Sequence, residues 1–467
     1  MNEMTKNKNN LVAIAKGDNP QETVKNGIEK LGGISNFINK GETIFIKAYL
    51  RVPELFPVNF NFDTLTELIS LCKTAGAKKV IVGSYADEDI NVSSFDELLG
   101  FKHLIESLGA EFHVFQEDVE YVIKEVEGNY IKIPKIIMNC DKLFFLNQVN
   151  VHPIFQINLS LLNSYSMVTQ DLQNAEKGGQ EGKDYLSSDQ FKHDLITNLL
   201  NVYEIRKPDL VINDFYYLLE KVGPFIFKDS NLKKVKLMVV GKNILAVDIV
   251  TLGLLNLDFL KNSLTSEARF RKFGISTMED IQLIGENIEE NKINIELTVS
   301  NLEDIPVINT DIITGQYCTG CFMEAYRFLN FLRTAMVKDL KYIITQSFLI
   351  GKNPPEPESN ENVIVFGDCA INSSKNREFR RMIIKEKKLF NKPQFISKKK
   401  DNLDKKPKLK EKDNKSILEL PGCPPNFYNC LSSFIKYYGK KTCPSGTFYL
   451  DMFKTYLQEK KLEEMSK

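Results

Sequence analysis

The sequence has no excess of either charge, since its 467 residues contain 61 Lys and Arg against 61 Asp and Glu. Proteins that bind nucleic acids or anionic membrane surfaces usually carry a basic surplus, so this balance supports neither class. The sequence also lacks a repeat of fixed period, a G-x-G-x-x-G after an expected strand, and a G-x-x-x-x-G-K-[ST]. The two commonest nucleotide-binding signatures are therefore absent.

A membrane-spanning segment is also missing. The longest apolar run, NILAVDIVTLGLLNLDFL, contains Asp248 and Asp258, and charges at those depths disfavour a membrane span. The first ten residues have no apolar core, so we expect no secretory signal peptide. We therefore expect a cytoplasmic protein, whose reducing surroundings disfavour a disulfide framework.

The cysteines are unevenly distributed along the chain. They are Cys72, Cys140, Cys318, Cys321, Cys369, Cys423, Cys430 and Cys443, so six of the eight lie in the last third. This asymmetry indicates a local thiolate site. We interpret Cys72 and Cys140 as core residues, because free cysteine is among the most buried residue types.

The first part of the sequence alternates between strand and helix patterns. Strands are expected at 43–50, 78–85 and 111–115, and helices at 63–77 and 94–110. This β-α-β-α-β order predicts a parallel sheet with helices on its faces. Further strands are expected at 133–140, 142–149, 208–214 and 236–241, followed by a helix at 244–257. The predicted fold class is α/β, with a parallel or mixed sheet and flanking helices.

The sequence predicts two parts that meet near residue 300. An N-terminal extension at 1–34 precedes an α/β domain at 35–300, and a smaller module follows at 301–467. Within the α/β domain, the polar, glycine-rich segment at 171–190 predicts a loop, and such loops often carry the ligand site.

The second part has the more irregular composition. It contains a proline-rich, acidic linker at 351–362, a buried strand at 363–370 that runs into Cys369, and a basic stretch at 375–388. The lysine-rich insert at 398–415 cannot pack a core, so we expect it to be disordered.

Four of the cysteines have the spacing of a metal or cluster site. Cys318 and Cys321 form a C-x-x-C pair that lets two sulfurs face one centre, and folding can bring Cys369 and Cys423 to it. A glycine lies one or two residues before Cys321, Cys369 and Cys423, where it lets backbone N–H groups approach sulfur closely. After Cys423, two prolines stiffen the chain before a helix expected at 426–438.

The spacing bears on the identity of the metal. Four-cysteine zinc sites usually draw their ligands as two close pairs, but this sequence has only one such pair. Dispersed single ligands favour a [4Fe–4S] cluster, with zinc or no metal as alternatives. Cys430 and Cys443 are either buried small side chains, or an alternate ligand or redox pair.

The same segments resemble a known module. CTGC, then GDCA after a strand, then PGCPPN before a helix are similar to the proximal-cluster module of nickel–iron hydrogenase small subunits and their complex I homologue. The resemblance covers about residues 311–438 and implies a [4Fe–4S] cluster held by the four cysteines on a flavodoxin-like sheet. The chain departs from that family in placing the module near its C-terminus, in the offset of Glu324 and in the insert at 398–415. Docking to a hydrogenase large subunit is therefore not implied.

The first part resembles the domain-of-unknown-function 362 family over about residues 35–290. The resemblance rests on the order of IFIKAYL, LISLCKTAGAKKVIVGSY, DKLFFLNQVNVHPIFQINLS, KPDLVINDFYYLLEKVGP and NILAVDIVTLGLL. Iron–sulfur ligands often follow this domain in that family, which agrees with the cysteine pattern. Ala48 and Tyr49 replace the family's Pro-Asn after Lys47, so a ligand role of that asparagine is lost.

Four residues are candidate catalytic or binding groups in the first part. Lys47 ends a strand and could bind an anion, or it could be a solvated lysine. His152 and His193 could act as acid, base or ligand, or could be structural. Asp214 ends a strand, at the sheet edge where ligands bind. Asp248 needs a partner if it is buried.

These patterns predict an iron–sulfur protein that transfers single electrons to or from a redox partner protein. Its N-terminal domain would bind an unidentified small molecule or a partner, and the basic stretch at 375–388 could dock an acidic redox partner or be a solvated face. The alternatives are a binding or assembly factor with a structural cluster, and an enzyme with a structural zinc site. No nucleic-acid partner is expected.

Overall fold

The computed structural model describes most of the chain in two compact units. The N-terminal unit contains residues up to Glu176 together with Lys192–Ser300, and the C-terminal unit contains Lys177–Phe191 and Asn301–Lys467. The described residues are 10–50, 54, 56–84, 100–115, 120–168, 188–273, 275, 277–343, 345–358, 362–381 and 417–452. The lysine-rich insert, most of the segment at 171–190 and residues 382–388 of the basic stretch lie outside them.

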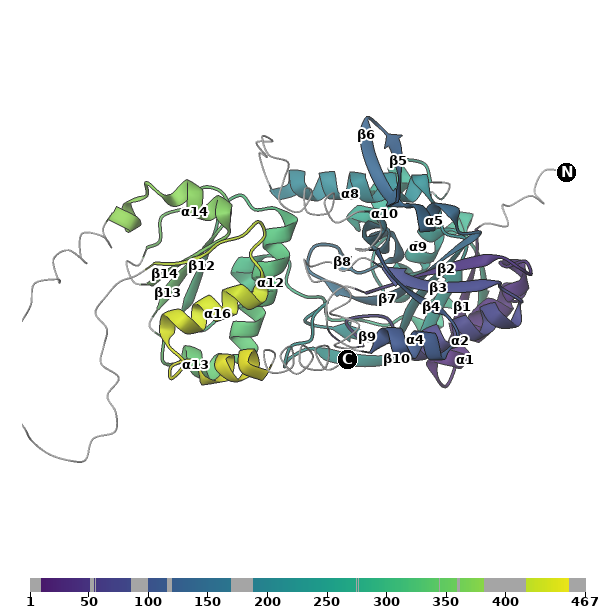
Figure 1. Ribbon diagram of the computed structural model, residues 1–467, viewed down its shortest axis with the longest axis horizontal. Helices are drawn as coiled ribbons and strands as arrows, with labels where there is room; N and C mark the ends of the chain where they lie inside the picture. The colour runs from purple at the N-terminus through teal and green to yellow at the C-terminus, as the bar shows by residue number, and fades with distance from the viewer. Residues whose placement is uncertain are drawn as a thin grey trace, which may run out of the picture. The chain divides into compact units, whose positions relative to one another are not determined.

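The N-terminal unit is built on a mixed nine-stranded sheet (Figure 1). Its path is β11-β1-β10-β9-β7-β2-β3-β4, and β8 pairs with β7. The strands are β1 (Leu11–Lys16), β2 (Thr43–Ala48), β3 (Lys79–Ser84), β4 (Glu111–Val114), β7 (Lys142–His152), β8 (Gln156–Ile157), β9 (Leu210–Glu220), β10 (Asn231–Gly241) and β11 (Gln282–Gly285). Strands β4, β3, β2, β7 and β9 are parallel, and β10 is antiparallel to β9 and β1. The expected α/β fold with a mixed sheet is confirmed.

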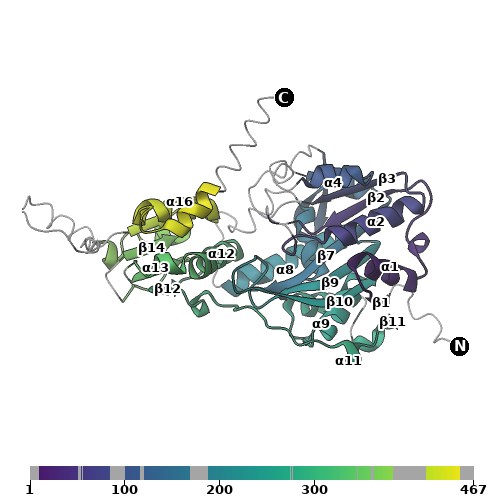
Figure 2. The same ribbon diagram turned by 90° about the horizontal axis from the view of Figure 1, so that it is seen from below.

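Helices cover both faces of this sheet (Figure 2). They are α1 (Pro20–Lys30), α2 (Phe62–Thr74), α4 (Phe101–Ser107), α5 (Lys135–Asn139), α6 (Ser160–Asn163), α8 (Ser188–Ile205), α9 (Ile244–Leu254), α10 (Ser263–Phe270) and α11 (Ile288–Asn291). A Cβ at Gly27 of α1 would lie 3.2 Å from Ala15, whereas a Cβ at Gly241, the partner of Val12 on β10, would lie 2.8 Å from Val247 of α9. Because side chains alternate along a strand, Ala15 and Val12 point to opposite faces, and so α1 and α9 cover opposite faces.

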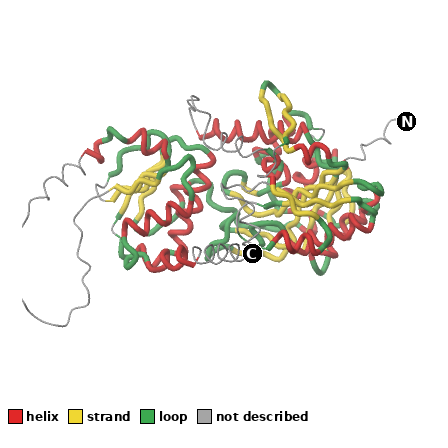
Figure 3. Tube along the Cα trace, viewed as in Figure 1, coloured by secondary structure: helices red, strands yellow, loops and turns green. Residues whose placement is uncertain are grey.

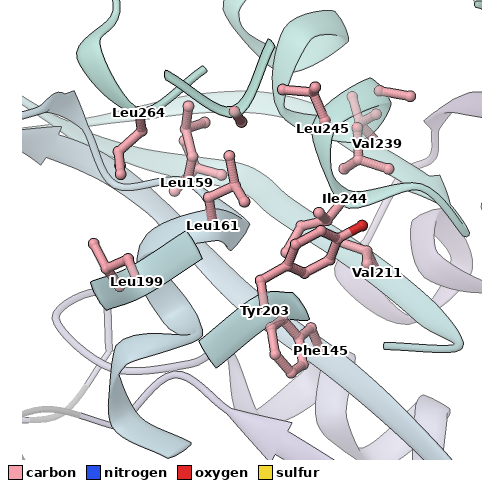
Figure 4. Close-up of a cluster of buried hydrophobic side chains, with 14 of the residues drawn as sticks. Phe145, Leu159, Leu161, Leu199, Tyr203, Val211, Val239, Ile244, Leu245 and Leu264 are labelled. Carbon is pink, nitrogen blue, oxygen red and sulfur yellow. The ribbon is translucent and has the colours of Figure 1, made fainter. Parts of the chain in front are cut away.

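Helix α9 occupies most of the long apolar run. It is buried along nearly its whole length, and it packs with Leu159, Leu161 and Leu199 in the core of the N-terminal unit (Figure 4). Within the described part of the chain, no helix is both long and apolar enough to cross a bilayer.

Two sequence-based expectations for the N-terminal unit need correction. Residues 11–30 are not part of an extension, because β1 pairs with β10 and β11 and α1 packs on the sheet. The segment at 133–140 is not a strand, because β6 (Asn129–Pro134) ends at its proline and α5 follows. Proline has no N–H to extend a ladder, which ends the strand there. Strand β6 instead forms a hairpin with β5 (Tyr121–Val126).

The C-terminal unit contains a four-stranded sheet, visible as the smaller group of yellow strands in Figure 3. Its strands are β12 (Thr310–Thr314), β13 (Gln346–Ile350), β14 (Asn362–Phe366) and β15 (Ile417–Leu420), all parallel and in sequence order. This order lacks the reversal of a flavodoxin-like sheet, 2-1-3-4-5. The helices are α12 (Thr319–Ala335), α13 (Val337–Leu340), α14 (Asp368–Ser374) and α16 (Phe427–Tyr438).

An aromatic cluster holds the C-terminal unit together. Phe328 of α12 is fully buried, and its ring centroid lies 5.9–6.5 Å from those of Phe348, Phe366, Phe427 and Phe434. These rings come from two strands and α16, so the cluster fixes α12 and α16 against the sheet. The segments that precede both helices are thereby positioned as well.

Candidate metal centre and buried polar sites

Three cysteine-bearing segments lie at one edge of the C-terminal sheet. Cys318 follows the end of β12 and caps α12, while Cys321 lies in the first turn of that helix. Cys369 is the second residue of α14, three residues after β14 ends, and Cys423 comes three residues after β15 ends. Because the carboxyl ends of parallel strands lie at the same edge of a sheet, the fold gathers all four thiols there.

Hydrogen bonds join the Cys369 segment to the Cys423 segment. The backbone N–H of Gly367 donates to the carbonyl oxygen of Leu420 at 2.8 Å, and that of Asp368 donates to Gly422 at 3.1 Å. The Gly422 N–H in turn donates to the Asp368 carboxylate at 3.0 Å. The two chain segments are therefore held together without a metal.

The C-x-x-C pair lies against the Cys369 segment. The Cys321 N–H donates to the Cys318 sulfur at 3.4 Å. Gly367 has a φ of +88°, and a Cβ there would lie 3.4 Å from the Cys321 sulfur. Glycine is favoured at Gly367 because this φ strains other residues. The Gly367 N–H donates to Leu420 rather than to a sulfur, so the expected approach of its N–H group to a thiol stays a prediction.

The four thiols lie close enough to affect one another electrostatically. A hydrogen bond between the two thiols lowers the pKa of Cys318 and raises the pKa of Cys321. Burial and the charges of Cys318, Cys423 and Cys369 raise the pKa of Cys321 further. Burial raises the pKa of Cys369, and the charge of the nearby Cys318 raises it to a lesser extent. Burial together with the charges of Cys318 and Cys369 raises the pKa of Cys423 to about 11. Four thiolates at this edge would repel each other unless a cation neutralised them.

The side-chain arrangement is informative about the type of centre. In the described part of the chain, no group of three or more His, Cys, Asp or Glu side chains is placed to hold a single metal ion. Tetrahedral zinc requires sulfurs about 2.3 Å from the ion, hence about 3.8 Å from each other. A [4Fe–4S] cluster is also held by four cysteines, but across several irons, so its ligands need not converge on one point. The four gathered thiols are the donor type that such a cluster uses.

The remaining cysteines are in buried surroundings. Cys72, Cys140, Cys430 and Cys443 are all buried. Burial raises the pKa of Cys72 and of Cys443 to about 12, and it raises the pKa of Cys430, with a further effect of the Glu324 carboxylate. These thiols stay protonated at neutral pH, which agrees with the interpretation of them as core residues.

Lys47 is fully buried in the N-terminal unit rather than solvated. It lies on β2 near its carboxyl end, and its ammonium group donates to Asn163 of α6 and to Ser166. Among the described residues, the buried Asn163 Nδ2 has no hydrogen-bond acceptor. Lys47 is therefore part of a buried, hydrogen-bonded group at the sheet edge, where unpaired polar atoms are costly.

A second polar network lies on the same sheet edge, beside β7 and β9. Asn147 of β7 donates to the side-chain oxygen of Asn213 of β9 at 3.0 Å. Asn213 in turn donates to Asp248 of α9 at 2.9 Å. Asp248 also accepts the backbone N–H groups of Ser160 and Leu161 at 3.0 and 2.9 Å. These contacts supply the partners that a buried Asp248 requires, and burial raises its pKa to about 7.

The sequence did not single out the asparagines of this network. Within the part of the chain that the structure describes, the side-chain oxygens of Asn147, Gln148 and Asn158 are buried without a hydrogen-bond donor. Most buried acceptors in folded proteins have a donor, so these three oxygens stand out. Asn147 and Asn213 are 66 residues apart, so only the pairing of β7 with β9 reveals them as neighbours.

The other predicted site residues are dispersed. Asp214 is buried on β9, accepts from Thr64 at 2.5 Å and from the Tyr216 N–H at 2.9 Å, and burial raises its pKa to about 6. Asp214 adjoins Asn213, so its side chain points to the opposite face from the Asn213 network. His152 is buried, and its Nδ1 accepts backbone N–H groups that follow it. His193 is exposed on α8.

Comparisons with known proteins identify one part of the chain. Residues 44–253 match the family model described as "Domain of unknown function (DUF362)". This match confirms the corresponding sequence resemblance within the N-terminal unit. The resemblance of residues 311–438 to the hydrogenase module stays a prediction.

Other comparisons add no argument about fold or function. No curated protein matches the sequence. A crystal structure of a structural-genomics target protein from Thermotoga maritima is similar at 13% identity, over 47% of this chain and 56% of that protein. Its TM-score of 0.29 is too low to support a shared fold.

Proposed function

We propose that this chain, whose residues 44–253 match the DUF362 family model, is an iron–sulfur protein. Cys318, Cys321, Cys369 and Cys423 would hold a [4Fe–4S] cluster. One observation carries the proposal: three segments far apart in the sequence bring these four thiols to the carboxyl edge of one parallel sheet. When bound, the cluster would supply one-electron oxidation and reduction.

The residues around the thiols would set the reduction potential of such a cluster. Gly367 and Gly422 have φ values of +88° and +137°, and Gly367 lies against the Cys321 sulfur without a side chain between them. Lys352 lies near enough to Cys369 to lower its pKa, against the larger effect of burial. A positive charge and nearby N–H groups both stabilise the more negative, reduced state of a cluster.

Exposure gives the centre an accessible side. Cys318 and Cys321 are buried, whereas Cys369 and Cys423 are exposed. A redox partner protein would approach from the Cys369 and Cys423 side, where electron transfer meets less protein. The N-terminal unit would bind an unidentified small molecule or a partner.

Two alternatives follow from the same geometry. In the first, the chain is a binding or assembly factor, and the cluster only joins the strand ends. In the second, the thiols move together around zinc in an enzyme without redox chemistry. Both alternatives use the same four thiols, and both need the reducing surroundings of the cytoplasm to keep those thiols unoxidised.

The test is the iron content and redox behaviour of the full chain. After anaerobic purification, we expect a brown protein with about four irons per chain, the content of one [4Fe–4S] cluster, and a visible absorbance that dithionite bleaches reversibly. Cys369→Ser and Cys423→Ser should lose most of the iron. The matched control is Cys430→Ala, which changes a cysteine outside the proposed ligand set and should keep the iron.

The outcomes separate the alternatives. A colourless protein with one zinc per chain would establish the zinc site. A brown protein whose cluster shows no reversible redox step would favour the structural role. Equal iron loss in Cys369→Ser and Cys430→Ala would contradict the ligand assignment.

A further inference from the structure

A cleft of about 460 Å³ lies in the N-terminal unit, at the edge opposite to Lys47 and Asn213. Lys142 is the first residue of β7 and Asp209 immediately precedes β9, so the cleft lies at the amino ends of these parallel strands. Its lining includes Phe37, Lys142, Tyr203, Lys207, Asp209 and Lys242. Its size is in the range of small-molecule sites.

The charge of the cleft is positive. Its lining contains the ammonium groups of Lys142, Lys207 and Lys242 against one carboxylate, that of Asp209. Asp209 already pairs with Lys142 at 3.7 Å and with Arg206 at 3.2 Å. Among the described residues, no carboxylate pairs with Lys207 or Lys242. A concave surface with unbalanced cations concentrates anions.

Aromatic rings hold the two unbalanced lysines in place. The Lys242 nitrogen lies 4.9 Å from the centre of the Phe37 ring, and the Lys207 nitrogen lies 5.5 Å from that of Tyr203. Cation–π contacts of this kind restrict the long side chains before a ligand arrives. Less side-chain freedom is then lost on binding, so the cleft is partly organised for an anion.

The cleft also offers an apolar surface and a helix end. Phe273 lines it beside Tyr203, with ring centroids 5.1 Å apart. Asn243 lines it as the N-cap of α9, accepting the N–H groups of Leu245 and Ala246. The positive end of the helix adds to the field of the lysines.

We propose that this cleft binds a phosphate-bearing small molecule with a planar ring, of the nucleoside diphosphate class. The phosphates would contact Lys142, Lys207 and Lys242, and the ring would pack on Phe273. The sequence lacks the glycine-rich signatures of nucleotide sites, so the phosphates would be held by lysine side chains rather than by a backbone loop. This site is separate from the thiols and does not depend on the proposed cluster.

The test is calorimetric titration of the full chain with ADP and with inorganic pyrophosphate at physiological ionic strength. We expect saturable binding of both, with ADP tighter than pyrophosphate. The double variant Lys207→Gln/Lys242→Gln should weaken both at least about tenfold, because it removes two charge-assisted contacts to phosphate. Lys25→Gln/Lys261→Gln removes the same charge at exposed positions outside the lining and should bind as the wild type does.

A second variant tests the ring. Phe273→Leu keeps an apolar side chain but removes the aromatic face, so it should weaken ADP and leave pyrophosphate unchanged. Equal affinity of the wild type for ADP and pyrophosphate would overturn the assignment of a ring-bearing ligand. No saturable binding of either probe, or equal weakening in the control pair, would overturn the site as a whole. Neither result would change the iron content on which the proposed function is tested.

Discussion

The two units place different chemistry at the same kind of position, the carboxyl edge of parallel strands. In the N-terminal unit this edge carries amides, Lys47 and Asp248, all buried and joined by hydrogen bonds. In the C-terminal unit it carries four thiols, of which two are exposed. The first edge is a closed polar network within the protein core, whereas the second is open on one side.

The difference shows what each edge still requires. Within the described residues, the buried network leaves only a few neutral amide atoms without a hydrogen bond. Burial and repulsion between the thiols raise the pKa values of Cys423 and Cys369, and their ligand form, the thiolate, would need a cation to offset that repulsion. A deficit of charge is energetically larger than a deficit of hydrogen bonds, so the C-terminal edge should depend more strongly on a bound group.

Removing the proposed cluster should therefore affect the two units unequally, and this is the largest effect that we expect. Stripping iron with an oxidant and chelator should leave amide hydrogen exchange in β7 and β9 unchanged. Amides near Gly367, Gly422 and the first turn of α12 should exchange at least about tenfold faster, because a group that binds only the native state stabilises it. Equal acceleration in both units, or none, would contradict the proposed dependence.

The second prediction concerns the pH dependence of the N-terminal network. The folded pKa of Asp248 is raised to about 7 from 3.8, so the native state keeps a proton that the unfolded chain has lost between these values. Stability should therefore fall as pH rises through this window, by up to about 1.4 kcal/mol per unit, and should level off above pH 7. Below pH 3.8 both states are protonated and the contribution is fully present.

Urea unfolding of Asp248→Asn checks this prediction. The variant cannot ionise, so the wild-type minus variant difference in unfolding free energy should decline between about pH 4 and 7. Asp214→Asn provides a comparison, because burial raises the pKa of Asp214 only to about 6 and its window should close earlier. A pH-independent difference for Asp248→Asn would mean that its carboxyl group is already ionised throughout.

The sequence reveals these two edges to different degrees. Cysteine is rare and its spacing is visible, so the three cysteine-bearing segments stand out in the sequence, and the helix after Cys423 could be predicted. Asn147 and Asn213 are common polar residues in strands, and only the parallel register of β7 and β9 shows that they face each other. Lys47 was predicted as a site residue, but its burial depends on α6 packing above it.

The fold shows a similar limit. The β2-α2-β3 rhythm was predictable because consecutive parallel strands follow each other in sequence. Strand β1 was not, because its partner β10 comes more than 200 residues later in the chain, and a short apolar stretch after a polar start carries no pairing signal. The antiparallel direction of β10 likewise depends on tertiary pairing rather than on its own residues.

The last and smallest prediction concerns Gly367, which is needed either for iron binding at the thiols or only for the conformation of its turn. Gly367 and Gly439 have nearly the same conformation, with φ values of +88° and +89° and ψ values of 152° and 143°. A Cβ at Gly367 would meet the Cys321 sulfur at 3.4 Å, whereas a Cβ at Gly439 would meet nothing within 4 Å. The two positions therefore differ in their surroundings but hardly in backbone strain.

Gly367→Ala and Gly439→Ala should each lower the free energy of unfolding by about 1–3 kcal/mol, the cost of a side chain in this backbone region. Only Gly367→Ala should also lower the iron content per folded chain, because its methyl group borders Cys321. Urea unfolding and iron analysis of both variants provide the measurement. Iron loss in both would mean that the centre responds to general destabilisation of the unit. Iron retention in both would mean that the Cys321 sulfur has room to move, so that Gly367 serves the turn alone.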